Sequence, residues 1–157
     1  DGNRRALQRL VRSGDAPGLL AYVDGAPAGW IAVAPREEYR RLERSRILKP
    51  VDERPGVWSV PCFFVARAHR RQGLTVALLR AAVEFAAGRG ARVVEGYPVE
   101  ADGRKPDVFV YTGLASAFRR AGFREVARRS PTRPVMRYDV KGKQKPSKRV
   151  QPGGPSA

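Results

Sequence analysis

A short basic turn between two apolar stretches is the part of the sequence best suited to chemistry. It reads Arg70-Arg71-Gln72-Gly73-Leu74-Thr75 and joins a strand-like run to a helix-like run. A helix N-terminus presents free backbone N–H groups and the positive end of the helix dipole, so it binds phosphate. Gly73 would let a ligand approach the backbone closely, and the arginines add positive charge. The turn therefore predicts a phosphate site, with an ordinary strand-to-helix connection as the alternative.

Other reactive side chains are few. Cys62 and His69 are each the single residue of their type, so the sequence predicts neither an internal disulfide nor a protein-bound zinc ion. The apolar neighbours of Cys62 indicate a packing residue rather than a nucleophile. His69 is expected on the surface or as an additional phosphate contact. These observations favour a reducing cytoplasmic location and no metal.

The basic turn needs a strand before it and a helix after it, and the sequence predicts both. Residues 57–66 are apolar, β-branched and aromatic, and Pro61 inside this run predicts a bulge or an unpaired stretch. Apolar side chains then recur at three- and four-residue steps from Leu74 to Ala86, before Gly88 and Gly90. We expect this longest helix to pack on a sheet.

The remaining predicted elements are shorter. In chain order they are a helix over 4–12, a hairpin of 19–23 and 30–33 around Asp24-Gly25, a surface helix over 37–46, a strand over 92–97, a helix over 112–121, and a closing pair of strands, 123–127 and 135–140. Together they predict one α/β (α+β) domain over 1–140, with a mixed, mostly antiparallel sheet flanked by helices. Residues 141–157 are almost devoid of apolar side chains, so we expect a disordered basic tail.

The charge of the chain is strongly positive. Its 157 residues carry a formal net charge of +16, and five of the positive charges lie in 141–157. Such a field attracts polyphosphates, nucleic acid and acidic protein surfaces, and it disfavours a polycationic substrate. No apolar run approaches the roughly 18 residues of a membrane span, so no membrane partner is expected.

The order of elements around the basic turn resembles the GNAT superfamily of N-acetyltransferases, over about residues 18–138. The family signature is Arg or Gln, any two residues, Gly, any one residue, and then Gly or Ala. Residues Arg70 through Thr75 correspond to it, except that Thr75 stands at the last position, where the family has Gly or Ala. The strings 57–71 and 94–99 resemble uncharacterised actinobacterial members. The resemblance implies transfer of an acetyl group from acetyl-CoA to a primary amine by direct attack. GNAT folds place a strand before the first helices, and we expect that strand to be missing here.

The resemblance also implies where the coenzyme binds. In the family, the backbone of the bulged strand bonds the acyl carbonyl and the pantetheine arm. That strand corresponds to Phe63, Phe64 and Val65, and the phosphates would lie at Arg70, Arg71, Gln72, Gly73, Leu74 and Thr75. Acetyl-CoA is then the cosubstrate.

An acetyl transfer of this kind needs the acceptor amine to lose a proton, because an amine of pKa near 10 is neutral only about once in 10³ molecules at pH 7. Glu95 is the candidate base, since a carboxylate inside an apolar strand is costly unless it has a purpose. Strand alternation places it on the same side as Tyr97. A salt bridge to an arginine is the alternative role.

The leaving thiolate also needs a proton. Many family members supply it from a tyrosine four residues before a Gly-Phe pair, but the corresponding residue here is Phe118, which cannot donate. The candidate acids are therefore Tyr111 and Ser116, with Tyr97, a water molecule or no dedicated acid as alternatives.

Two other functions are compatible with the sequence. A GNAT protein that binds acyl-CoA but has lost catalysis would explain Phe118. A nucleic-acid-binding protein would explain the pI of 11.2, although no helix-turn-helix, zinc or single-strand-binding motif is present. The acceptor, a small molecule or a protein amine, and the choice between monomer and homodimer are left open by the sequence.

Overall fold

The central strand of the fold is broken in two at a proline. The computed structural model describes residues 16–100 and 111–140, and in these residues the predicted strand appears as β4 (Val57–Val60) and β5 (Phe63–Val65). Pro61 lies between them and lacks the N–H group that would continue a ladder. The interruption predicted from the sequence is therefore confirmed.

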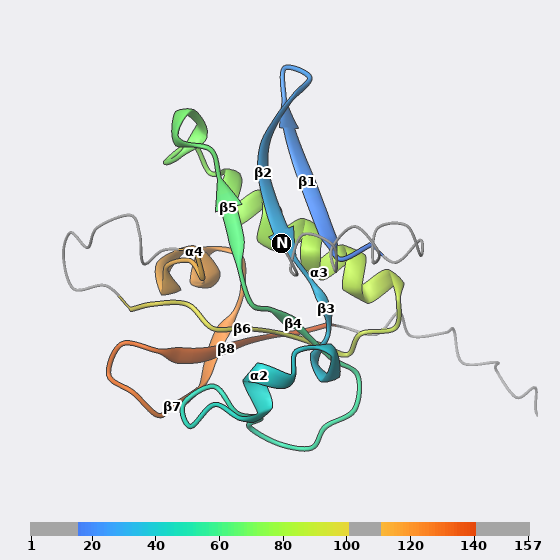
Figure 1. The fold of residues 1–157 in the computed structure, drawn as a ribbon, viewed down its shortest axis with the longest axis vertical. Coiled ribbons are helices and arrows are strands. Elements are labelled where there is room, and N and C mark those ends of the chain that lie inside the picture. The colour runs from blue at the N-terminus through green and yellow to red at the C-terminus, as the bar shows by residue number, and fades with distance from the viewer. Residues whose placement is uncertain (1–15, 101–110, 141–157) are drawn as a thin grey trace, which may run out of the picture.

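The two halves of this strand belong to different sheets (Figure 1). The three-stranded sheet has the order β1 (Gly18–Val23), β2 (Ala26–Ala32), β5, and the five-stranded sheet has the order β3 (Ala34–Pro35), β4, β6 (Val93–Gly96), β8 (Pro134–Asp139), β7 (Arg124–Arg128). Among the paired strands of these two sheets, only β4 and β6 are parallel. The mixed, mostly antiparallel arrangement is confirmed, and the sequence analysis did not foresee its division into two sheets.

The hairpin of β1 and β2 is also confirmed. Asp24 and Gly25 both have positive φ, 50° and 77°, as the tight two-residue turns that match strand twist require. The ladder shifts register between Ala21 and Tyr22. β2 then pairs with β5 on its other edge, which fixes the position of β5 away from β6.

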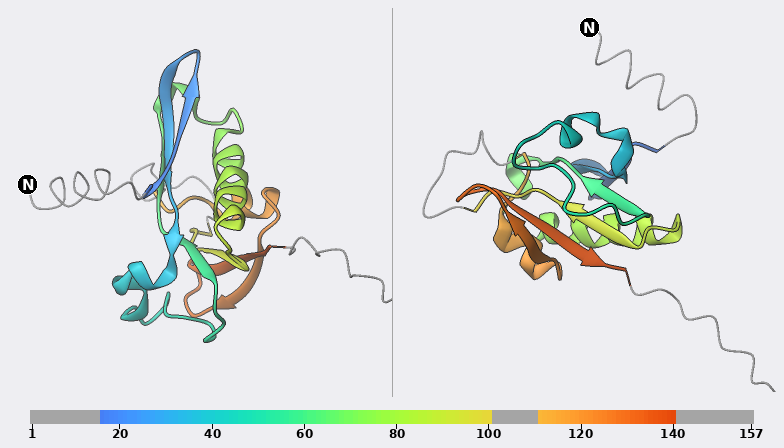
Figure 2. Two further views of the ribbon diagram at one scale, coloured as in Figure 1. Left: turned by 90° about the vertical axis from the view of Figure 1, so that its right-hand side faces the viewer. Right: turned by 90° about the horizontal axis from the view of Figure 1, so that it is seen from below.

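Helices cover both faces of the five-stranded sheet (Figure 2). The long α3 (Leu74–Gly88) and the short α4 (Ala115–Arg120) lie on one face, and α2 (Arg40–Glu43) lies on the other. The main core forms between the sheets, α3 and α4, and its buried members include Ile31, Phe63, Leu79, Val94, Phe118 and Met136. A second cluster, Leu42, Tyr97 and Val135, lies on the α2 side.

Two predicted helices are shorter than expected. The segment 37–46 forms a 3₁₀ turn, η1 (Arg36–Glu38), and the four-residue α2, because Tyr39 interrupts the helix with φ −101° and ψ 67° and packs against the α2-side cluster. The helix predicted over 112–121 begins only at Ala115, since Gly113 has a φ of 80° and Leu114 is extended. The helix predicted over 4–12 and the tail predicted over 141–157 lie outside the described residues. The expectation that the first GNAT strand is missing also concerns a region outside them.

Candidate functional site

The edge of β5 that faces away from β2 is the centre of the candidate site. The bonds Ala32 N to Cys62 O and Ala66 N to Ala28 O, on either side of β5, show that Cys62, Phe64 and Ala66 direct their backbone groups toward β2. Because hydrogen-bonded and non-bonded pairs alternate in an antiparallel ladder, the backbone groups of Phe63 and Val65 point to the opposite edge. Parallel pairing of β4 with β6 ends at Val60 and Gly96, so β5 does not pair with β6. We call the region between β5 and β6 the gap; the backbone of Tyr111 borders it at Phe63.

The three residues predicted to hold the acyl arm therefore differ in role. Phe63 and Val65 direct backbone groups into the gap, whereas Phe64 is in register with Trp30 of β2 and its side chain is exposed. In this structure the Phe63 N–H donates to the carbonyl of Tyr111 at 2.8 Å. A strand edge with outward N–H and C=O groups can pair with an amide-containing chain in the same way that a neighbouring strand would.

The basic turn leads from this edge to the N-terminus of α3. Arg71 and Gly73 have positive φ, 63° and 81°, and alternation of left- and right-handed residues turns successive N–H groups toward one point, which suits an anion. Gly73 is the N-cap of α3 and makes no side-chain capping bond. A Cβ at Gly73 would meet nothing within 4 Å, so there is open space beside this residue at the helix N-terminus.

The other residues of the turn hold it in shape. Arg70 Nε donates to the carbonyl of Val65 at 3.1 Å, and Gln72 Nε2 donates to the carbonyl of Ala68 at 3.0 Å. Arg71 is exposed, while Leu74 and Thr75 are partly buried in the first turn of α3. All six predicted turn residues thus lie between the end of β5 and the start of α3, where an anion could be bound.

Glu95 lies on the α2 side of the sheet and is completely buried. Its Oε1 accepts a hydrogen bond from the Tyr97 hydroxyl at 2.8 Å, and its Oε2 accepts one from Nε of Arg137 at 2.6 Å. Glu95 and Tyr97 share a side of the strand, as expected. The structure therefore contains the arginine salt bridge that the sequence analysis gave as the alternative to a base.

This pair extends into a network across the sheet. The Arg137 guanidinium also donates to both carboxylate oxygens of Asp52, at 2.6 and 3.1 Å. Arg36 Nη1 is buried, lies 4.0 Å from Oε1 of Glu95 and has no hydrogen-bond partner among the described residues. Sequence analysis did not identify these partners, although the alternation of Val135 and Arg137 along β8 placed an arginine on the buried α2 side.

Tyr97 connects Glu95 to Ser59. The two hydroxyl oxygens are 2.8 Å apart, and since Tyr97 gives its only proton to Glu95, Ser59 must donate to Tyr97. Burial and the neighbouring Glu95 raise the pKa of Tyr97. The phenol therefore stays protonated at neutral pH and acts as a hydrogen-bond donor.

Phe118 fills the centre of the protein beside the gap. It is fully buried and contacts the rings of Phe63 and Phe123. Gly96 and Gly113 leave room for it, because a Cβ at either glycine would clash with the ring of Phe118 or of Phe63. The residue at the family's tyrosine position is thus a packing residue in this chain.

The predicted acids lie at the surface. Tyr111 is 62% exposed, and Ser116 is exposed on α4. Glu100 is bound by Arg119 and Arg128, which lower its pKa to about 2. Burial raises the pKa of Cys62, which favours its unreactive thiol form.

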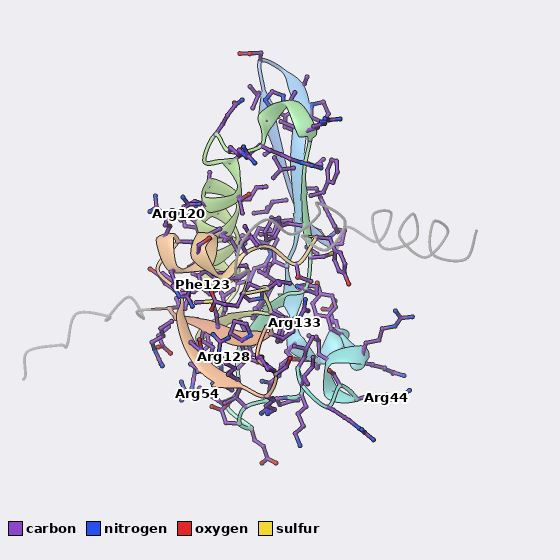
Figure 3. The ribbon with its side chains drawn as sticks, turned by 90° about the vertical axis from the view of Figure 1, so that its left-hand side faces the viewer. Arg44, Arg54, Arg120, Phe123, Arg128 and Arg133 are labelled. Atoms are coloured by element: carbon purple, nitrogen blue, oxygen red, sulfur yellow. The ribbon has the colours of Figure 1, made fainter. Side chains whose placement is uncertain are left out.

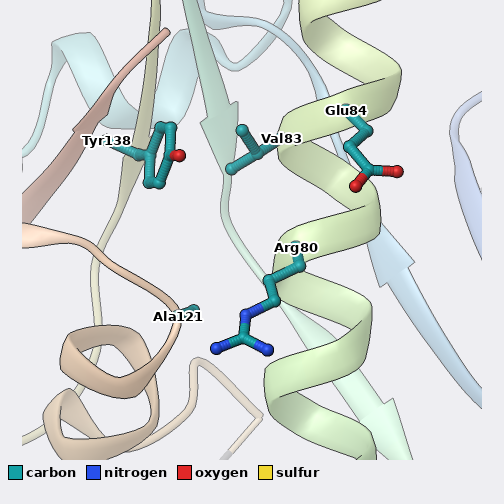
Figure 4. A pocket seen from close by; sticks show the side chains of 5 residues that line it. All are labelled: Arg80, Val83, Glu84, Ala121 and Tyr138. Atoms are coloured by element: carbon teal, nitrogen blue, oxygen red, sulfur yellow. The ribbon is translucent and has the colours of Figure 1, made fainter.

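A separate cleft lies between α3, α4 and β8 (Figure 4). It is lined by Arg80, Val83, Glu84, Ala121 and Tyr138. Tyr138 alternates with Arg137 along β8, so the cleft opens on the face of the sheet opposite to Glu95. It is therefore distinct from the gap beside β5.

Within residues 16–100 and 111–140, no group of three or more His, Cys, Asp or Glu side chains could hold a metal ion. In the same residues, no helix is long and apolar enough to cross a membrane.

Comparison with solved structures shows the same fold. The chain is similar to a GNAT-family protein from Desulfovibrio desulfuricans (20% identity, TM-score 0.58, 87% of this chain and 78% of the other). It is also similar to the ribosomal-protein-alanine N-acetyltransferase of Brucella melitensis (18%, 0.57, 88% and 77%). A third similar structure, from Salmonella typhimurium, was solved with acetyl-CoA as its cofactor (16%, 0.59, 94% and 78%).

The search of curated proteins gave no match. The family model described as "Acetyltransferase (GNAT) family" matches residues 2–112, which include β1 to β6, the gap and the basic turn. This match covers more than half of the sequence, and the chain therefore belongs to the GNAT acetyltransferase family.

Proposed function

We propose that the chain transfers an acetyl group from acetyl-CoA to a primary amine. The observation that carries the proposal is the continuity of two binding features: the edge of β5 that faces away from β2 and the N-terminus of α3. Val65 belongs to the first and is bonded to Arg70 of the second. A ligand with an amide-containing arm and a pyrophosphate matches this combination in both chemistry and order.

The residues fit the coenzyme in detail. The outward Phe63 C=O and Val65 N–H can pair with the amides of a pantetheine arm, whereas the Phe63 N–H and the Val65 C=O are bonded to Tyr111 and Arg70. The amides around Gly73, together with the charge of Arg71, suit the pyrophosphate. When bound, acetyl-CoA supplies the reactive thioester, and these groups would hold and orient it.

For the acceptor, we propose that Glu95 assists removal of the amine proton through Tyr97. Glu95 and the Tyr97 hydroxyl that donates to it are both buried, so the proton would have to reach Glu95 by relay through Tyr97 rather than by direct contact with the acceptor. Attack of the neutral amine nitrogen on the thioester carbon forms the amide, and the C–S bond breaks with its electron pair on sulfur. Tyr111 and Ser116 stay candidate donors to that sulfur, since both are exposed and precede or belong to α4.

The second candidate function is coenzyme binding without catalysis. Phe118 favours it, because a fully buried phenyl ring stands where many relatives carry a hydroxyl. The two functions make the same prediction for coenzyme binding and differ only in turnover on amines.

The test is calorimetric titration of the full chain with acetyl-CoA and with desulfo-CoA. Gly73→Glu places a negative side chain in the open space before α3, and we expect micromolar binding of both ligands to fall by at least about 100-fold. Gly25→Glu is the matched control, since Gly25 also has positive φ and open space around it but lies in the β1–β2 turn.

Each result has a definite meaning. Loss in Gly73→Glu alone supports the coenzyme site, and thiol release with an amine then separates catalysis from binding. Absence of binding by the unaltered chain, or equal weakening in both variants, rejects the proposed coenzyme site.

A further inference from the structure

Arg133 carries a positive charge that no acid within the described residues neutralises. It lies in the loop between β7 and β8, one residue before β8, and is partly buried. Its Nη1 donates to the Thr112 hydroxyl oxygen at 3.1 Å. This neutral contact is the only side-chain bond that its guanidinium makes to residues 16–100 and 111–140.

The neighbouring arginines are paired in a different way. Arg137 contacts Glu95 and Asp52, and Arg128 contacts Glu100 and Glu125. A partly buried cation without a counter-charge loses hydration that a single neutral hydrogen bond does not replace. Burial accordingly lowers the pKa of Arg133. A ligand that brings an anion would relieve this cost.

The position of Arg133 points to the site. Val135 and Arg137 face the α2 side, where they contact the cluster of Tyr97 and the carboxylate of Glu95. Extending the alternation by one step places Arg133 on the same side. Figure 3 shows it away from Phe123, which lies toward α4.

Arg133 is also linked to the edge of β5 that faces away from β2. Its partner Thr112 follows Tyr111, and the Tyr111 carbonyl accepts the Phe63 N–H. Phe63 begins β5, whereas the basic turn is tied to Val65 at the other end. The two cationic groups therefore lie at opposite ends of the edge, so the coenzyme phosphates at the turn leave Arg133 for another ligand.

We propose that Arg133 binds a carboxylate of the acceptor, so that the preferred substrates are amines bearing an acid group, such as amino acids or short acidic peptides. This inference rests on the proposed acetyl transfer. A guanidinium presents two parallel N–H groups that match a carboxylate. The net charge of +16 also attracts anionic acceptors and repels polycations.

The experiment compares amines that differ only in the acid group. Initial rates of thiol release from acetyl-CoA are measured with β-alanine against ethylamine and with γ-aminobutyrate against propylamine. We expect the unaltered chain to prefer the acids. In Arg133→Gln, kcat/KM for the acids should fall about 30-fold, mainly through KM, with the neutral amines unchanged. Arg133→Lys should recover part of the loss because it keeps the charge.

Arg44→Gln is the matched control. Arg44 is exposed at the end of α2, forms no ion pair within the described residues, and its loss removes one charge from the same side (Figure 3). It should leave the preference for acids intact. If Arg44→Gln lowers it as much as Arg133→Gln, the effect is one of overall charge and the proposal is wrong.

Binding measurements distinguish this inference from the proposed function. Acetyl-CoA affinity should be equal in Arg133→Gln and the unaltered chain, and N-acetyl-β-alanine should bind the CoA complex of the unaltered chain more tightly than N-ethylacetamide. Efficient use of neutral amines, with no preference for acids, would overturn the role of Arg133 alone. Failure of acetyl-CoA to bind the unaltered chain would overturn both.

Discussion

Arg137 and Glu95 form a salt bridge inside the sheet, with Nε of the arginine 2.6 Å from Oε2 of the glutamate and both side chains at least 98% buried. Although burial by itself lowers the pKa of Arg137, its bonds to Asp52 and Glu95 outweigh that effect and raise it. Arg137 therefore stays charged, and the pair joins β6 to β8. Removing only one partner would leave the other buried with fewer contacts to compensate for its desolvation.

The first prediction separates a structural role of this pair from a chemical one. Glu95→Gln should destabilise the fold by about 3 kcal/mol, because it leaves Arg137 with only Asp52. The double variant Glu95→Leu with Arg137→Leu should recover most of that loss, since an apolar pair avoids the desolvation penalty. Both effects are measured by denaturant unfolding.

An acetyl-transfer assay of the double variant then tests whether Glu95 has a chemical role. If Glu95 takes part in proton removal, the double variant stays inactive although it is stable. Recovery of activity together with stability would show that the pair is only structural.

The second prediction concerns the Tyr97 hydroxyl. Tyr97→Phe deprives both Glu95 and Ser59 of a partner inside the protein, so we expect a loss of about 1 to 3 kcal/mol in unfolding free energy. Tyr22→Phe is the matched control, because Tyr22 is 59% exposed, and its unfolding free energy should not change. If Glu95 acts through this hydroxyl, kcat of Tyr97→Phe should fall more than KM changes.

A third prediction follows from Asp52. Its bonds with Arg137 lower its pKa to about 2, below the value of about 3.9 expected in the unfolded chain. Because the folded state binds the proton less tightly, the stabilisation is present above the unfolded pKa and is lost as the pH falls through the folded pKa. Unfolding free energy should therefore decrease between about pH 4 and pH 2.

The variant Asp52→Asn identifies this contribution. It should be less stable than the unaltered chain at pH 6, by no more than about 1 kcal/mol because Asp52 is partly solvated, and the two curves should converge near pH 2. Glu53→Gln, at an exposed neighbour, should follow the unaltered curve. Parallel curves for Asp52→Asn and the unaltered chain would contradict the assignment.

Local signals made part of this structure predictable. Pro61 marked the break in the central strand and Asp24-Gly25 marked the hairpin, because both act through their own backbone chemistry. The basic turn was recognisable for the same reason, since Gly73 and the arginines are adjacent in sequence. What a residue does to its immediate neighbours can be inferred without the fold.

Relationships between distant segments were not predictable. Arg137 reaches Asp52 across 85 positions in the sequence, and several arginines could equally have paired with Glu95. Tyr39 interrupts the predicted helix over 37–46 by packing against the α2-side cluster, an effect of tertiary contacts on a segment with ordinary helical composition. That Arg133 lacks an acidic partner among the described residues likewise becomes visible only in the folded structure, because its neighbours come from distant parts of the sequence.

The last prediction uses the backbone of the basic turn. Arg71 is one of two described non-glycine residues with positive φ, a conformation that costs an L-residue about 1 to 2 kcal/mol and persists at sites where function requires it. Arg71→Gly relieves this strain but adds chain entropy to the unfolded state, so stability should change by less than about 1 kcal/mol. The backbone shape of the turn is kept while the charge is removed.

Coenzyme affinity of Arg71→Gly should then fall about tenfold, and the difference should shrink as salt is raised, because the exposed guanidinium acts through screened attraction. Calorimetric titration at two ionic strengths tests this, with Arg71→Lys as the control that keeps the charge and the strain. If Arg71→Gly binds acetyl-CoA as tightly as the unaltered chain, the strained arginine has no part in holding the phosphates.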